Sequence, residues 1–100
     1  MIQKERVKQK DKHAITVTFT VPKDHPHKPL AVVGDFNNWD AMVNPFKKQR
    51  NGSYSATVAL KAGQRYAFRY MCEGGNWCND EAADDYEHNV FGGDNCIVNT

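Results

Sequence analysis

The feature that most constrains this fold is a strict alternation of apolar and polar residues between positions 14 and 21. Threonines separate the apolar positions, which are Ile15, Val17, Phe19 and Val21. Successive side chains of a β-strand point to opposite faces, so the pattern predicts a strand with one buried and one solvated face. Pro22 has no N–H to donate to a strand ladder, and we expect the strand to end there.

Alternation returns in residues 53–60 and 66–72, and Leu30 to Gly34 predicts a more fully apolar strand. Asn51-Gly52 is a strong turn signal, which we expect to close a hairpin between residues 42–48 and 53–60. Residues 95–99 predict a last strand. This spacing, with almost no helical pattern, predicts an all-β fold: a two-sheet antiparallel sandwich of about seven strands.

The chain is long enough for one domain, which we place at residues 13–100. Residues 1–12 are basic and have no consistent period, so we expect a mobile N-terminal arm. Asp80 is expected to cap a single helical turn over Glu81–Asp84, inside the acidic segment 80–87.

The net charge of +1 gives no reason to expect nucleic acid or an anionic membrane as a partner. No apolar stretch approaches the ~20 residues of a membrane span, and residues 2–12 are too polar for a signal peptide. The three cysteines are odd in number and form no Cys-x-x-Cys pair, which favours reduced thiols in the cytoplasm: Cys72, Cys78 and Cys96. We expect a monomer.

No catalytic motif is present, and the clustered carboxylates lie on one predicted loop. Glycoside hydrolysis needs two carboxylates held across a cleft, which a small sandwich does not easily build, so we expect no enzyme and no cofactor. Four histidines form no set with zinc-ligand spacing, and we expect no metal site: His13, His25, His27 and His88. Cys72 and Cys78 could face each other with His88 nearby, but buried inert thiols are the favoured interpretation.

The run from Val32 to Asp40 suggests a binding function. A short apolar strand ends in Gly34-Asp35-Phe36-Asn37-Asn38, and Trp39 follows. Such turn residues predict that Trp39 lies on a loop rather than inside a core strand. A flat apolar ring beside amide and carboxylate groups suits a sugar, whose C–H face covers the ring while polar groups bond the hydroxyls.

Three segments in this order resemble a known family. They are Val33 to Trp39; Asn51-Gly52-Ser53-Tyr54 through Ala62 to Tyr70, ending at Trp77; and Asn89 to Val98. Residues 30–99 are similar to the isoamylase N-terminal or early-set domain. This is carbohydrate-binding module family 48, which includes the glycogen-binding domain of AMP-activated protein kinase β subunits. The tail, with Phe91-Gly92-Gly93-Asp94-Asn95, looks like small free-standing bacterial members.

The resemblance implies an immunoglobulin-like sandwich without catalysis of its own, related to modules that accompany glycoside hydrolase family 13 enzymes. It implies binding of an α-1,4-linked glucan such as glycogen or maltodextrin, and a glucan-metabolising enzyme as a possible protein partner. The two platform tryptophans of the family correspond to Trp39 and Trp77, and a lysine between them corresponds to Arg69. An asparagine that bonds glucose corresponds to Asn95, an inserted leucine to Phe91, and a neighbouring threonine to Gly93.

Each of these residues also has a structural alternative. Either tryptophan could close an edge of the sandwich, and Arg69 could form a salt bridge with the acidic segment. Asn95 could shape the turn into the last strand, and the size of Phe91 also suits the core. The departures at Arg69 and Gly93 favour a rival function, a protein-interaction module that has lost sugar affinity.

Overall fold

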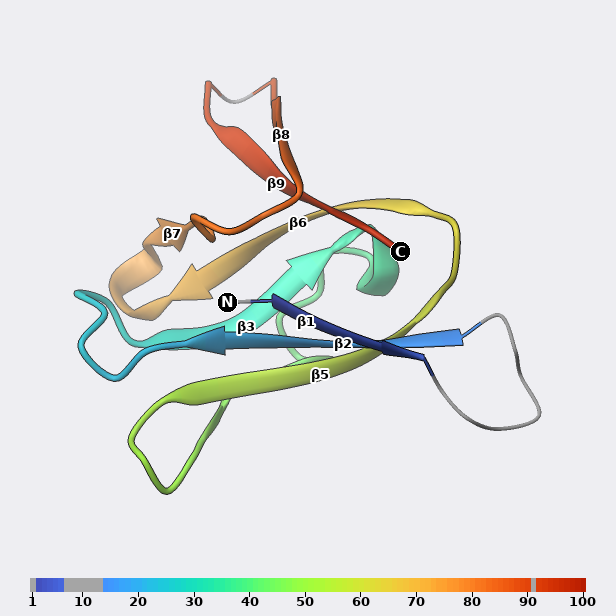
Figure 1. Cartoon of the computed structure of the whole chain (residues 1–100). Coiled ribbons are helices and arrows are strands. Elements are labelled where there is room, and N and C mark those ends of the chain that lie inside the picture. The colour runs from blue at the N-terminus through green and yellow to red at the C-terminus, as the bar shows by residue number, and fades with distance from the viewer. Residues whose placement is uncertain (1, 7–13, 91) are drawn as a thin grey trace.

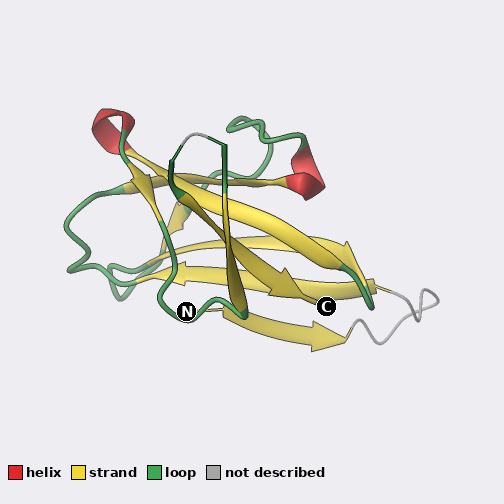
Figure 2. Ribbon diagram, turned by 90° about the horizontal axis from the view of Figure 1, so that it is seen from above, coloured by secondary structure: helices red, strands yellow, loops and turns green. Residues whose placement is uncertain are grey.

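A computed structural model describes residues 2–6, 14–90 and 92–100. The described strands form two layers (Figures 1 and 2), and their bounds are β1 (Ile2–Arg6), β2 (Ala14–Val21), β3 (Pro29–Gly34), β4 (Lys47–Lys48), β5 (Tyr54–Lys61), β6 (Arg65–Cys72), β7 (Trp77–Cys78), β8 (Asp85–His88) and β9 (Asp94–Asn99). Two short 3-10 turns, η1 (Asp35–Asn37) and η2 (Glu73–Gly75), complete the described elements. No helix in these ranges is long and apolar enough to cross a bilayer.

All strand pairs are antiparallel, and they form two sheets. The first has the order β1-β2-β5-β4, and the second has the order β3-β6-β9-β8 with β7 added beside β6. The alternating face of β2 supplies the core, where Phe19 and Phe68 lie 4.8 Å apart between ring centroids. The predicted all-β, immunoglobulin-like antiparallel sandwich is therefore confirmed.

Three strands were not expected, which are β1, the two-residue β7 and β8, and the described residues hold nine strands rather than about seven. The expectation of a mobile arm is wrong for residues 2–6, because β1 pairs with β2 in the register Ile2↔Phe19 to Arg6↔Ile15. A salt bridge of 2.5 Å from Lys4 Nζ to Asp84 Oδ2 ties this edge strand to the acidic segment. Residues 7–12 lie outside the described residues. β8 is a further addition, and all four of its side chains are exposed.

Two local expectations need correction. Only Lys47–Lys48 of the expected strand 42–48 pairs with β5, while Pro45 bridges to Ala31 in the other sheet. The Asn51-Gly52 turn closes the hairpin as predicted, with Gly52 at a φ of 88°. Asp80 accepts a hydrogen bond of 2.7 Å from the Ala82 N–H, but residues 81–82 form a turn and not a helix.

β6 organises the second sheet, because its two halves have different partners on one edge. Residues 65–68 pair with β9, and residues 70–71 pair with β7. Arg69 is the residue of β6 that lies between these two halves. Paired residues of an antiparallel ladder share a face. Trp77, which pairs with Met71, therefore lies on the same face as Arg69.

Candidate functional site

The turn after β3 places Trp39 at one end of this face. A side chain on Gly34 would clash with the Ala67 carbonyl oxygen and lie 2.9 Å from Phe68 Cβ, so the close approach of the turn to β6 requires glycine. The buried Asn37 side chain fixes the turn by accepting from the Gly34 N–H at 3.0 Å and donating to the Val32 carbonyl at 3.0 Å. The predicted loop position of Trp39 is confirmed.

Trp39 is held in an unusual backbone conformation. Its φ is 58°, and that of Asn38 is 56°, in the left-handed region that bulky residues rarely adopt. The Trp39 Nε1–H donates to Asp35 Oδ1 at 3.2 Å, and the other Asp35 oxygen accepts from the Ala67 N–H at 2.9 Å. The carboxylate thus connects the indole to β6. Backbone strain of this kind costs roughly 1–3 kcal/mol and persists where surrounding contacts impose it, often at binding sites.

Trp77 lies at the other end of the same stretch of β6. Gly74 and Gly75, with φ values of 71° and 76°, reverse the chain and bring Trp77 opposite Met71. Cys78 next to it is buried, whereas Trp77 is 48% exposed. From Ala67, which bonds to Asp35, to Met71, which pairs with Trp77, the strand advances by four residue steps, or about 13 Å at 3.3 Å per residue.

Arg69 lies on β6 halfway between Ala67, which bonds to Asp35, and Met71, which pairs with Trp77. Its Cζ is 5.5 Å from the centroid of Trp77, and its Nε donates to Asn79 Oδ1 at 3.0 Å. The described residues give Arg69 no salt bridge; Arg65 pairs with the acidic segment instead, at 3.3 Å from Asp85. The alternative of a surface salt bridge for Arg69 is therefore not supported in the described part of the chain.

Asn95 faces the same region from β9. Its Oδ1 accepts from Asn89 Nδ2 at 3.2 Å. The Gly93 N–H donates at 3.1 Å to the side chain of Asn89, not to that of Asn95. Asn89 thus closes the tip of the β8–β9 hairpin, and Asn95 lines the groove that these residues share.

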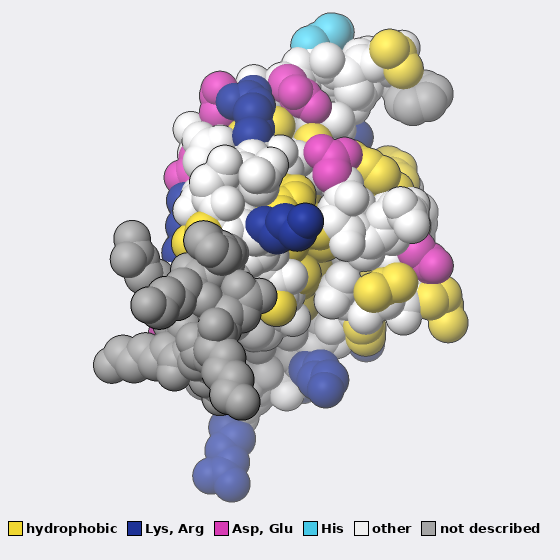
Figure 3. Space-filling model, turned by 90° about the vertical axis from the view of Figure 1, so that its right-hand side faces the viewer, with side chains coloured by type: hydrophobic (Ala, Val, Ile, Leu, Met, Phe, Trp, Pro, Cys, Tyr) yellow, Lys and Arg dark blue, Asp and Glu magenta, His cyan; other side chains and the backbone are white. Residues whose placement is uncertain are grey.

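These residues line one groove of about 930 Å³. It brings together four of the five predicted site residues, which are Trp39, Arg69, Trp77 and Asn95. Phe91, the fifth, lies outside the described residues. The β8–β9 hairpin, which projects at the top of the molecule in Figure 3, contributes one side of the groove, with Val90 at 93% exposure.

Several residues of the groove were not predicted. Asp35, Glu87, His88 and Asn89 also line it, and Asn79 supports Arg69 from outside its lining. Asp35 lies in the run from Val32 to Asp40 that suggested a binding function. Its carboxylate was the one sequence signal for these additional groove residues. Glu87, His88 and Asn89 come from β8 and its turn, and a strand with no buried face leaves no alternation to detect.

The ionisable groups behind the groove are structural. The Tyr70 hydroxyl donates to Asp80 Oδ2 at 2.7 Å, and burial raises the pKa of Tyr70 well above 10. Burial opposes ionisation of Asp80, but hydrogen bonds from Tyr70 and the Ala82 N–H lower its pKa. A glycosidase acid needs a raised carboxyl pKa, so a shift in this direction does not suit Asp80 to that role.

The cysteines are free and buried, as predicted. Burial, and then the hydrogen bond with Cys78, raises the pKa of Cys72 to about 12, and burial raises that of Cys96 to about 11. His88 Nδ1 lies 3.1 Å from Asp94 Oδ1. In the described ranges no three His, Cys, Asp or Glu side chains form a group that could hold a metal ion.

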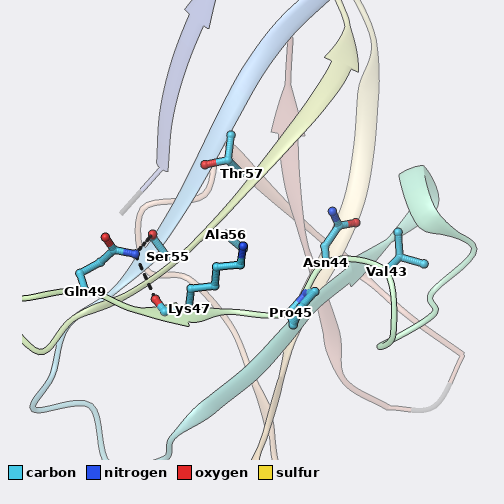
Figure 4. Close-up of a pocket in the computed structure, with 8 residues that line it drawn as sticks. All are labelled: Val43, Asn44, Pro45, Lys47, Gln49, Ser55, Ala56 and Thr57. Atoms are coloured by element: carbon cyan, nitrogen blue, oxygen red, sulfur yellow. Dashed lines mark hydrogen bonds between the residues drawn. The ribbon is translucent and has the colours of Figure 1, made fainter.

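A second groove of about 390 Å³ lies beside β4 and β5 (Figure 4), and its lining residues are Val43, Asn44, Pro45, Lys47, Gln49, Ser55, Ala56 and Thr57. Gln49 Nε2 bridges Ser55 Oγ at 2.8 Å and the Lys47 carbonyl at 3.2 Å. None of the described residues that line this groove is aromatic. It therefore offers hydrogen bonds to a sugar but no surface for stacking.

The chain was compared with known proteins. Residues 27–87 match the family model of carbohydrate-binding module 48, the isoamylase N-terminal domain. A 47-residue segment, 46% of the chain, is 43% identical to the 1,4-alpha-glucan branching enzyme GlgB of Deinococcus radiodurans, and it spans 7% of that enzyme's length. The family match includes Trp39, Arg69 and Trp77 and extends over more than half of the chain. The chain belongs to the carbohydrate-binding module 48 family.

Proposed function

We propose that this protein binds an α-1,4-linked glucan, such as glycogen or a maltodextrin, without acting on it. The observation that carries the proposal is the gathering of Trp39 and Trp77 in one groove that Arg69 and Asn95 also line. Indole rings cover the apolar face of sugar rings, while the guanidinium and the amide bond hydroxyl groups. The ~13 Å along β6 between the residues to which the two tryptophans are attached favours an oligosaccharide over a single sugar.

The comparisons support the carbohydrate class. The chain belongs to a carbohydrate-binding family, and part of it is similar to a 1,4-alpha-glucan branching enzyme. Both findings favour an α-glucan as the ligand. The site is open, so we expect a dissociation constant on the order of 10⁻⁵ to 10⁻³ M, given the cost of ordering a flexible glycan. The buried free thiols suit a reducing compartment, and we propose the cytoplasm.

Titration with maltoheptaose, observed through backbone and indole N–H signals by NMR, tests the proposal. We expect shifts confined to the groove, and none with a cello-oligosaccharide of equal length. Trp39→Ala should abolish the maltoheptaose shifts, because stacking on an aromatic ring contributes much of the affinity of such sites. The far-UV circular dichroism of this variant should remain that of the wild type. Retained binding by folded Trp39→Ala would refute the site.

Exposed apolar side chains away from the groove favour a second candidate, a protein-interaction module. Leu30 is 43% exposed, Met42 86% and Val43 54%. Exposed apolar side chains that lie together are typical of protein interfaces, and Met42 and Val43 are neighbours in the chain. A glucan-metabolising enzyme is the partner we would test, by sedimentation of the mixture. Complex formation with the enzyme, together with no shifts at millimolar maltoheptaose, would favour this function over glucan binding.

A further inference from the structure

Gly93 has no backbone reason to be glycine. Its neighbour Gly92 has a φ of 86°, in the region where other residues are strained. Gly93 is not among the residues with positive φ, so its backbone conformation is open to any amino acid. The absence of a side chain at this position, which lines the groove, therefore needs another explanation.

The space above Gly93 is occupied by Arg69. A Cβ built on Gly93 would lie 3.4 Å from Arg69 Nη1, 3.9 Å from Arg69 Cζ and 3.5 Å from Asn89 Nδ2. These are ordinary van der Waals distances, so a methyl group would fit there in contact with both side chains. A larger side chain directed toward these atoms would require the flexible end of Arg69 or of Asn89 to move.

The guanidinium is held on its other sides by two residues. Trp77 stacks on it at 5.5 Å, and Asn79 accepts the Nε–H at 3.0 Å. Within the described residues no carboxylate forms a salt bridge with Arg69, so its charge is not already paired there. A planar guanidinium fixed in this way presents its terminal N–H groups in a constant direction, and little rotamer freedom remains to be lost on binding.

We propose that Gly93 is a specificity-determining residue of the groove that acts through Arg69. Its missing side chain leaves the room in which the guanidinium lies against Trp77 and donates to hydroxyl oxygens of the bound glucan. The proposal rests on the glucan-binding function proposed above. Under this proposal Gly93 and Arg69 make one joint contribution to glucan affinity, and neither residue makes it without the other.

A double-mutant cycle with maltoheptaose as the probe tests this coupling. In the Arg69 background, Gly93→Val should raise the dissociation constant about tenfold, within the range seen for contacting residues, and Gly93→Ala should raise it less. Arg69→Lys should weaken binding by itself, because a flexible ammonium replaces the fixed fork. Adding Gly93→Val to Arg69→Lys should then change affinity less than about twofold, since the lysine side chain can avoid the valine. Equal losses in both backgrounds would overturn the proposal.

A matched control and a ligand-free measurement separate this proposal from the function on which it rests. Ala59→Val places a similar side chain on the exposed face of β5, away from the groove, and should leave affinity unchanged. Without sugar, Gly93→Val should shift the Arg69 Nε–H and Trp77 indole N–H signals, and unchanged signals would overturn the proposal. If the wild type does not bind maltoheptaose, the proposed glucan-binding function fails together with this role for Gly93. If it binds and the losses are additive, only the proposal about Gly93 fails.

Discussion

Asp35 should link the stability of the fold to the sugar site, and Asp35→Ala tests this. The carboxylate accepts from the Ala67 N–H at 2.9 Å and from the Trp39 indole at 3.2 Å. Hydrogen bonds to charged groups contribute roughly 1.5–3 kcal/mol each when buried. Asp35 is exposed, so we take the lower end for the Ala67 bond and less for the indole bond. The expected loss of unfolding free energy is about 2 kcal/mol.

The same change should also reduce glucan affinity. Without Asp35, the φ of 58° at Trp39 loses one of the contacts that impose it, and strain of ~1–3 kcal/mol favours relaxation of the indole out of the groove. We expect a maltoheptaose dissociation constant at least about tenfold higher, which corresponds to ~1.4 kcal/mol. Urea unfolding followed by circular dichroism measures the first effect, and NMR titration of the folded protein measures the second.

Asp40→Ala is the matched control for Asp35→Ala. Asp40 lies in the same turn, and its Oδ1 accepts from the Met42 N–H at 2.9 Å, but it does not line the groove. Its loss should cost no more than about 1 kcal/mol, as for an exposed hydrogen bond, and should leave affinity unchanged. The reasoning is refuted if Asp35→Ala binds maltoheptaose as the wild type does, or if both variants lose affinity equally.

Three further predictions follow from the core and the ionisable groups. Burial opposes ionisation of Asp84, but bonds from Lys4 and the Asn99 N–H lower its pKa below 3.8. Its stabilising effect is therefore present above pH 3.8 and lost as the pH falls through the folded pKa, and Asp84→Asn should lose less stability between pH 7 and pH 3 in urea titrations. Cys72 and Cys96, whose pKa values burial raises to about 12 and about 11, should resist a thiol reagent at pH 8 until the protein unfolds. Phe68→Ala should lower the unfolding free energy by about 3–5 kcal/mol; a loss below 1 kcal/mol would contradict its core position.

The sequence predicted the strands that bury one face and missed those that do not. β2 was predicted at its observed bounds, because its alternating residues fill the core. β1 carries a single apolar residue, Ile2, so its pairing with β2 follows from contacts distant in sequence, including Lys4 with Asp84. β8 has four exposed side chains and gives no periodic signal. Hydrophobic patterning reports burial, and edge strands can form without it.

The sequence indicated the aromatic and charged residues of the site, but not the residues that hold them in place. Trp39 and Trp77 stand at turns that the sequence marks clearly, and Arg69 lies on the polar face of a clear strand. The roles of Asn79 and Asn89 depend on which strands meet beside β6. That change of partner from β9 to β7 has no local signature, because it is decided by tertiary register.

Both ends of the groove are fixed to β6, and this determines its geometry. Asp35 ties the Trp39 turn to Ala67, and backbone pairing ties Trp77 to Met71, with Arg69 halfway between them. A strand has a fixed rise and alternates its faces, so the spacing of the tryptophan attachments is set at about 13 Å and Arg69 must point to the same side. A one-residue insertion between Ala67 and Met71 would turn one attachment to the opposite face. The groove therefore depends on the unbroken register of this one strand.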